Sequence, residues 1–143
     1  MDEAYLHQVA AELQASVSIL WRRLRQTKPI GELTFTESTA LSLLERSGPT
    51  TSAALAREEH MTPQSMGATL TALERQGLVE RHPDPDDGRR ILMSVTAAGR
   101  RTVKDRRLAR GRQLAEALSG FSSEELEQLR AAAPLIERLA RGM

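Results

Sequence analysis

The chain has 143 residues, 40% of them hydrophobic, and it carries 20 basic against 19 acidic side chains. This length suits one domain with helical extensions, and the apolar content argues against disorder throughout. The absence of cysteine excludes disulfides, cysteine-bound zinc, iron–sulfur clusters and thiol-based sensing. No apolar run reaches the roughly 18 residues of a membrane span. No signal peptide is apparent either, so we expect a cytoplasmic protein.

The N-terminal part of the chain is predicted to be helical. Leucine and valine recur every three or four residues from Leu6 to Leu24, which predicts one long amphipathic helix ended by Pro29 and Gly31. Residues 34–37 fit a capping box, in which a Thr hydroxyl and a Glu carboxylate each bind a backbone amide of the other residue. A short helix is expected to follow.

The centre of the chain predicts two further helices separated by a tight turn. A capping cluster at residues 50–52 precedes a short helix, and His60 falls in the turn. Thr62 followed by Pro63 is a strong helix start, because threonine caps well and proline is favoured at the first helical position. This helix is expected to end at Gly77 in a left-handed conformation.

The second central helix has two contrasting faces. At 100° per residue, one face carries Met66, Thr69, Leu70 and Leu73. The opposite face is small and polar, and consists of Gln64, Ala68, Thr71 and Arg75. A shallow polar face of this kind fits the DNA major groove, which is about 12 Å wide.

A hairpin is predicted to follow. Two short strands, at residues 78–82 and 90–95, flank a dense turn signal at residues 84–88. Ile91, Met93 and Val95 are expected on one side of the second strand. Arg89 lies at the tip, where an arginine can enter a minor groove, and Asp87 is close enough in sequence to brace it.

The C-terminal part predicts two more helices. Thr96 can cap a helix that runs to about residue 118, and its segment 100–112 holds seven basic residues and one acidic residue. A second capping box at residues 122–125 starts the last helix. Apolar residues recur along that helix at three- and four-residue spacing, and Pro134 inside it predicts a kink or a break.

A short helix, a turn, a second helix and a hairpin are the elements of a winged helix-turn-helix. The predicted fold is therefore mainly α with a small β-hairpin wing. Residues 32–96 are predicted to form a winged helix-turn-helix DNA-binding lobe, which would place the protein on the nucleoid. Residues 1–31 and 97–143 are predicted to form a helical dimerisation region. The apolar stripes of the terminal helices favour a homodimer, because the central lobe offers too little surface to cover both.

Charge leaves a second interpretation open. Residues 49–95 contain five basic and seven acidic side chains, an unfavourable balance for binding phosphates. The basic surplus lies outside that segment, at residues 22–28 and 100–112. The alternative is a helical protein–protein interaction module without DNA binding, in which the helix-turn-helix is ordinary packing. An enzyme, a metal site and a cofactor are not expected, because the three histidines are scattered and no phosphate loop or nucleophile motif is present.

Three segments resemble the MarR family of bacterial transcriptional regulators. They are residues 73–81 (LERQGLVER), 84–90 (DPDDGRR) and 92–99 (LMSVTAAG). The family pattern is L-E-x-x-G-L-I/V-x-R, followed by a D-x-R wing and an L-T-x-x-G ending, and the flanking helices also fall in the family's order. The resemblance implies an obligate homodimer that reads a pseudo-palindromic operator and usually represses transcription. It also implies that Arg89 contacts the minor groove and that Asp87 orients Arg89.

The residues predicted to contact double-stranded DNA are Thr51, Ser52, Thr62, Pro63, Gln64, Ser65, Gly67, Ala68, Thr69, Thr71, Arg75, Asp87, Gly88, Arg89 and Arg90. The family often has Thr or Ser at the position of Gly67 and Arg at that of Ala68. We therefore expect fewer direct base contacts and more readout of DNA shape.

The resemblance also implies a possible effector. Family members often respond to small aromatic or phenolic ligands bound between the dimer helices and the DNA-binding lobe. Tyr5, Trp21 and Phe35 are the candidates to line such a pocket, but ordinary core packing is the favoured interpretation for Trp21 and Phe35.

Overall fold

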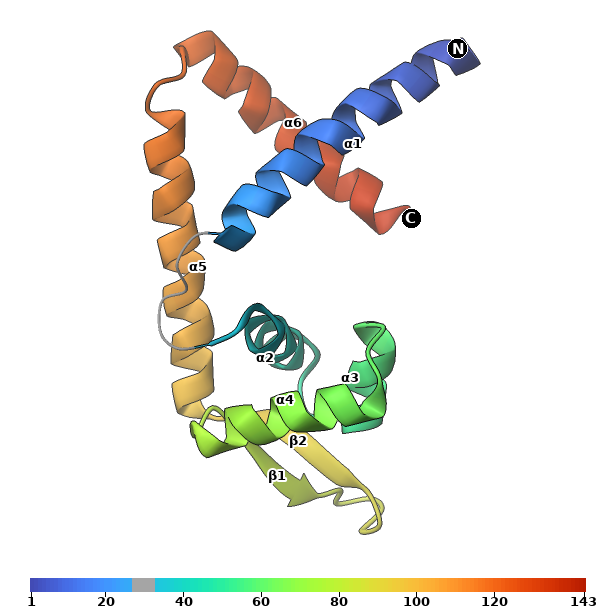
Figure 1. Cartoon of the computed structure of the whole chain (residues 1–143), viewed down its shortest axis with the longest axis vertical. Coiled ribbons are helices and arrows are strands. Elements are labelled where there is room, and N and C mark those ends of the chain that lie inside the picture. Colours follow the sequence, from blue (N-terminus) through green and yellow to red (C-terminus); the bar gives the residue numbers. More distant parts are fainter. Residues whose placement is uncertain (27–32) are drawn as a thin grey trace. The chain divides into compact units, whose positions relative to one another are not determined.

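The computed structural model describes residues 1–26 and 33–143, which fall into two compact units, Met1–Arg107 and Leu108–Met143. In chain order the elements are α1 (Glu3–Gln26), α2 (Phe35–Ser47), α3 (Ser52–Glu58), α4 (Pro63–Arg75), β1 (Val79–Pro83), β2 (Ile91–Val95), α5 (Ala97–Leu118) and α6 (Ser123–Arg141) (Figure 1). This order confirms the predicted, mainly α fold with a β-hairpin wing. The expected end of the first helix at Pro29 and Gly31 lies outside the described residues.

The core of the first unit lies where α2, α3 and α4 pack against the hairpin. Its fully buried large side chains are Leu41, Leu44, Leu55, Met66, Leu70, Leu73 and Met93. The inner face predicted for α4 is thus confirmed for its three large apolar residues. Thr69 is only partly buried, and its hydroxyl donates to the carbonyl of Ser65 at 2.9 Å.

The capping box predicted at the start of α2 forms only in part. The Thr34 hydroxyl accepts from the backbone amide of Glu37 at 3.1 Å. The Glu37 carboxylate, however, accepts from Nε2 of Gln76 at 3.2 Å, at the far end of α4. The predicted reciprocal bond is replaced because the fold brings a side-chain donor to that carboxylate.

The hairpin is antiparallel, with Val79 opposite Val95 and Pro83 opposite Ile91. Thr50 extends the sheet through an isolated bridge to Met93, with backbone bonds of 3.1 and 2.7 Å. This third partner was not predicted from the sequence. Met93 and Val95 are buried as expected, whereas Ile91 is 46% exposed, because it lies at the end of the strand next to the hairpin tip.

The hairpin base is joined tightly to the start of α5. Gly77 has φ +74°, which confirms the predicted left-handed end of the α4 segment. The Thr96 hydroxyl donates to the carbonyl of Gly77 at 2.7 Å and accepts from the amide of Gly99 at 3.1 Å. A Cβ at Gly99 would lie 2.2 Å from the carbonyl oxygen of Leu78, so only glycine fits this contact.

The terminal helices α1 and α6 contain no buried residue. The capping box at the start of α6 is confirmed: Ser122 accepts from the amide of Glu125 at 3.1 Å, and the Glu125 carboxylate accepts from the amide of Ser122 at 2.8 Å. The break considered at Pro134 does not occur, since α6 continues through it. The carbonyl of Arg130, which loses its helical partner to the proline, belongs to an exposed residue that water can reach.

Candidate nucleic-acid interface

The start of α4 is fixed by its own cap. Thr62 is the N-cap, and its hydroxyl accepts from the amide of Ser65 at 3.1 Å and donates to the Ser65 hydroxyl at 3.0 Å. Pro63 occupies the first turn and has no amide hydrogen. The amide of Met66 is bound to the carbonyl of Thr62, so within the described chain the Gln64 amide is left without a partner in this turn. The sequence had suggested more than one free backbone amide at this helix start, and among the described residues the structure leaves one.

The outer face of α4 is largely as predicted. Gln64, Ala68 and Arg75 are exposed, and the Ser65 side chain is also exposed in the first turn. Thr71 is different because it is partly buried and its hydroxyl is shared between two partners, the carbonyl of Gly67 and the guanidinium of Arg81. Four exposed small or polar residues therefore remain available to a partner.

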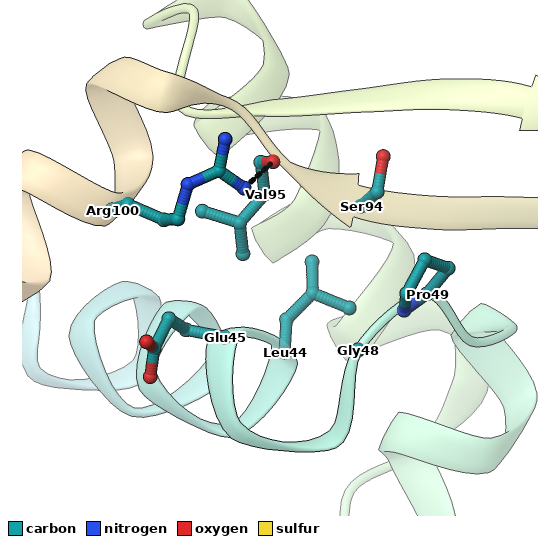
Figure 2. A pocket seen from close by; sticks show the side chains of 7 residues that line it. All are labelled: Leu44, Glu45, Gly48, Pro49, Ser94, Val95 and Arg100. Atoms are coloured by element: carbon teal, nitrogen blue, oxygen red, sulfur yellow. Dashed lines mark hydrogen bonds between the residues drawn. The ribbon is translucent and has the colours of Figure 1, made fainter.

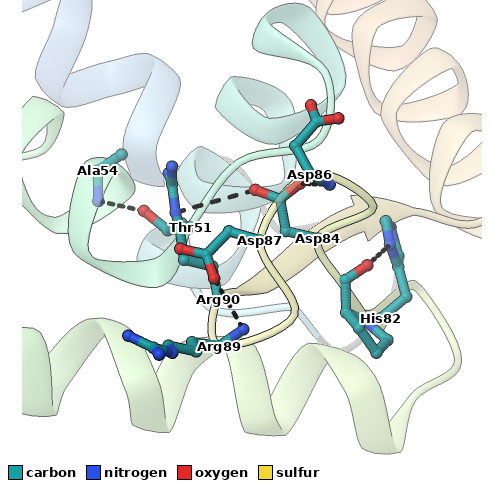
Figure 3. A network of polar contacts seen from close by, with 9 residues as sticks. Thr51, Ala54, His82, Asp84, Asp86, Asp87, Arg89 and Arg90 are labelled. Carbon is teal, nitrogen blue, oxygen red and sulfur yellow. Dashed lines mark hydrogen bonds and ion pairs between the residues drawn. The ribbon is translucent and has the colours of Figure 1, made fainter.

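The start of α3 is the second predicted contact region. Thr51 is the N-cap of α3, and its hydroxyl accepts from the amide of Ala54 at 3.2 Å (Figure 3). Ser52 is partly exposed in the first helical position. Leu55 and Ala56 are buried in the core, and α3 packs against α4.

The wing tip is held by hydrogen bonds between its aspartates and its backbone (Figure 3). The Asp84 carboxylate accepts from the amide of Asp86 at 2.9 Å and lies 3.9 Å from Nε of Arg90. The Asp87 carboxylate accepts from the backbone amide of Arg89 at 3.1 Å. The sequence had suggested that Asp87 braces the guanidinium of Arg89. In the structure Asp87 instead holds the backbone that carries Arg89.

Free positive charge in this lobe is scarce. Of the five arginines between residues 49 and 95, Arg81 is paired with Glu74 and Arg90 with Asp84. Within the described part of the chain, the other three form no ion pair; they are Arg57, Arg75 and Arg89, and all are exposed. One of these cations is at the wing tip and another is at the C-terminal end of α4.

Comparison with known proteins identifies the fold's family. A family model described as the MarR family matches residues 32–90. An HTH-type transcriptional regulator of Mycobacterium bovis is 38% identical over 128 residues, which cover 90% of each chain. The chain belongs to the MarR family. It is accordingly a helix-turn-helix transcriptional regulator.

Two further relatives extend this assignment. An HTH-type transcriptional repressor of Mycobacterium bovis is 36% identical over 99 residues, or 69% of this chain and 66% of the repressor. A crystal structure described as that of a transcriptional regulator of Pseudomonas aeruginosa superposes with a TM-score of 0.79 at 34% identity, covering 98% and 99% of the two chains. The likeness to known transcriptional regulators therefore extends beyond residues 32–90 to the terminal helices.

The three aromatic residues proposed for a MarR-type effector pocket are not brought together. Trp21 and Phe35 meet edge to face with ring centroids 5.8 Å apart, and Arg25 lies 4.2 Å over the Phe35 ring. Trp21 is 50% exposed, so the expectation that it is ordinary core is wrong for the single chain. Tyr5 is exposed and lies 16 residues earlier on α1, about 24 Å along the helix axis.

A pocket of about 110 Å³ lies elsewhere in the first unit, between the end of α2, β2 and α5 (Figure 2). Leu44, Glu45, Val95 and Arg100 are among its lining residues, and the guanidinium of Arg100 donates to the carbonyl of Val95 at 3.2 Å. None of the three predicted aromatic residues lines it. It is too small to enclose a drug-sized ligand, which needs at least about 300 Å³.

Proposed function

We propose that this MarR-family chain is a homodimeric repressor that binds a pseudo-palindromic operator in double-stranded DNA. The observation that carries the proposal is that one compact lobe exposes both the polar face of α4 and the free arginine of the wing tip. In the proposed complex α4 enters the major groove, where Gln64 can pair with adenine. Arg89 enters the adjacent minor groove.

The homodimer is supported by the terminal helices. Large apolar side chains recur along both helices while remaining exposed, including Leu6, Val9, Val17 and Leu20 on α1 and Leu126, Leu129 and Ile136 on α6. Exposed apolar stripes of this extent are characteristic of an interface. A second copy of the same chain would cover them and place two winged lobes on one duplex.

In vitro selection from a random-core duplex library, using the purified full chain, tests the DNA-binding proposal. We expect a pseudo-palindrome whose half-site centres are separated by one helical turn, about 10–10.5 bp, or a multiple of it. Binding should also weaken steeply as salt rises, because the protein releases counterions from phosphates. Failure to enrich any sequence, with binding insensitive to salt, would instead favour the protein–protein interaction module.

The sign of regulation is a separate part of the proposal. The 36%-identical relative of Mycobacterium bovis is named a repressor, which supports repression here. In vitro transcription from a promoter that overlaps the selected site should decline as protein is added. An increase in transcript would contradict repression while leaving DNA binding intact.

Release by a small aromatic ligand is proposed at the contact between α1 and α2. There Trp21 and Phe35 supply aromatic surface, and Arg25 supplies a cation that an aromatic carboxylate can approach. Trp21 is the one tryptophan of the chain, so tryptophan fluorescence reports directly on the contact between α1 and α2. We expect 4-hydroxybenzoate to quench it saturably and to release the selected duplex; linear, unsaturable quenching would contradict the site.

A further inference from the structure

The flank of α4 that faces β1 carries a polar cluster, which joins Thr71 of the predicted outer face to Arg81 of β1. Arg81 on β1 donates from Nε to the Glu74 carboxylate at 2.9 Å and from Nη2 to the Thr71 hydroxyl at 3.1 Å. Thr71 donates in turn to the carbonyl of Gly67 at 2.9 Å. Gly67, Thr71 and Glu74 are spaced by four and three residues, so they form one row along the helix beside Arg81.

The guanidinium of Arg81 is fixed but not saturated. An arginine has five N–H donors, and two of those on Arg81 are used by Glu74 and Thr71. Within residues 1–26 and 33–143 the remaining three have no partner, and the side chain is 44% exposed. A guanidinium that is already held by two hydrogen bonds loses little conformational freedom when it binds a ligand. Its planar arrangement of N–H donors matches the oxygens of a phosphate.

Gly67, at the other end of the row, is not required by the fold. It lies inside α4, where glycine is one of the poorest helix formers. A Cβ at this position would meet no heavy atom within 4 Å, so alanine would fit without a clash. A glycine that neither packing nor backbone conformation requires leaves room for another molecule to approach the helix closely.

We propose that Arg81 and Gly67 together contact the sugar–phosphate strand that lies between the major and the minor groove. This inference rests on the proposed DNA binding. When α4 lies in the major groove and the wing in the adjacent minor groove, one sugar–phosphate strand crosses the angle between α4 and the hairpin. Arg81 donates to a phosphate of that strand. The missing side chain at Gly67 lets the strand approach α4, and Glu74 is a positioning residue for Arg81.

The Gly67→Ala variant tests the close approach, using the full chain and the duplex recovered by selection. The added methyl improves helix propensity, so the melting temperature should rise by a few degrees. Affinity for the duplex should nevertheless fall by roughly tenfold, the loss expected for one charge-assisted contact. A stabilised variant that binds as tightly as the wild type overturns the proposal.

Gly111→Ala is the matched control. Gly111 is also a helical glycine, in α5, and a Cβ added there would likewise meet no heavy atom within 4 Å. This variant should gain similar thermal stability and keep the wild-type affinity. If Gly111→Ala weakens binding as much as Gly67→Ala, the effect is not local to α4 and the proposal fails. If the wild type selects no duplex at all, the proposed function itself has failed.

Salt dependence tests Arg81 separately from folding. Arg81→Gln should reduce the slope of log affinity against log salt by about 1, the value for one lost phosphate contact. Arg81→Lys keeps the charge and should restore most of the slope. A slope that Arg81→Gln leaves unchanged would show that Arg81 only joins α4 to β1, whatever happens to the affinity.

Discussion

His60 shows how a single residue can store backbone strain. It lies in the turn between α3 and α4 with φ +52°, and its side chain is exposed. The left-handed region costs an L-residue about 1–2 kcal/mol, whereas glycine adopts it freely but loses about 0.4–1 kcal/mol through its flexible unfolded state. The strain should therefore exceed the entropic cost of a glycine at this turn.

We expect His60→Gly to raise the free energy of unfolding by up to about 1 kcal/mol, measured by urea denaturation. Affinity for the selected duplex should not change, since His60 is not among the proposed contacts. A lower denaturation midpoint would contradict the strain argument.

Residue roles at the wing and at β1 were only partly predictable from sequence. Proximity correctly indicated that Asp87 and Arg89 interact, but it could not distinguish the backbone amide from the guanidinium as the donor. Arg81 was missed as a candidate contact. Its partners Glu74 and Thr71 lie seven and ten residues away on another element, so only the packing of the hairpin on α4 brings them together.

At the scale of elements, local signals were reliable and tertiary ones were not. The caps of α3, α4 and α6 formed as predicted, because each needs only residues within one helical turn. In the capping box at α2, the Glu37 carboxylate accepts from Gln76, 39 residues away, and not from the backbone amide of Thr34. The bridge between Thr50 and Met93 had no sequence signal, because it joins a loop to a strand beyond two helices.

The junction of β2 with α5 gives a prediction for a whole element. Gly99 lets the start of α5 lie against the hairpin base, where an added Cβ would be 2.2 Å from the Leu78 carbonyl oxygen and 2.7 Å from Val95 Cγ1. Gly99→Ala should lower the free energy of unfolding by about 1–3 kcal/mol, because backbone must move to relieve the overlap. Urea denaturation measures this loss in the free energy of unfolding. Gly111→Ala is the control, because an added Cβ there meets no heavy atom within 4 Å. Equal stability of the two variants would contradict the close packing at Gly99.

At the scale of the whole molecule, the apolar faces of α1 and α6 are the largest feature that a single chain leaves unexplained. Leu129 is 47% exposed on α6, beside exposed polar Gln128. Leu129→Glu should shift the chain from twice its 15.8 kDa mass to that mass at micromolar concentration, because a charge in an apolar interface is costly to bury. Gln128→Glu adds the same charge one residue away and should remain dimeric; a dimeric Leu129→Glu variant would contradict the proposed interface.

Two copies of this chain are proposed to bind one duplex, each through α4 and its wing. The sedimentation-equilibrium mass of the full chain mixed with the selected duplex tests it most directly. We predict two chains per duplex, and a complex that Arg89→Ala weakens without changing the mass of the free protein. One chain per duplex, or no complex at the salt concentration used for selection, would contradict DNA binding by a dimer of this chain.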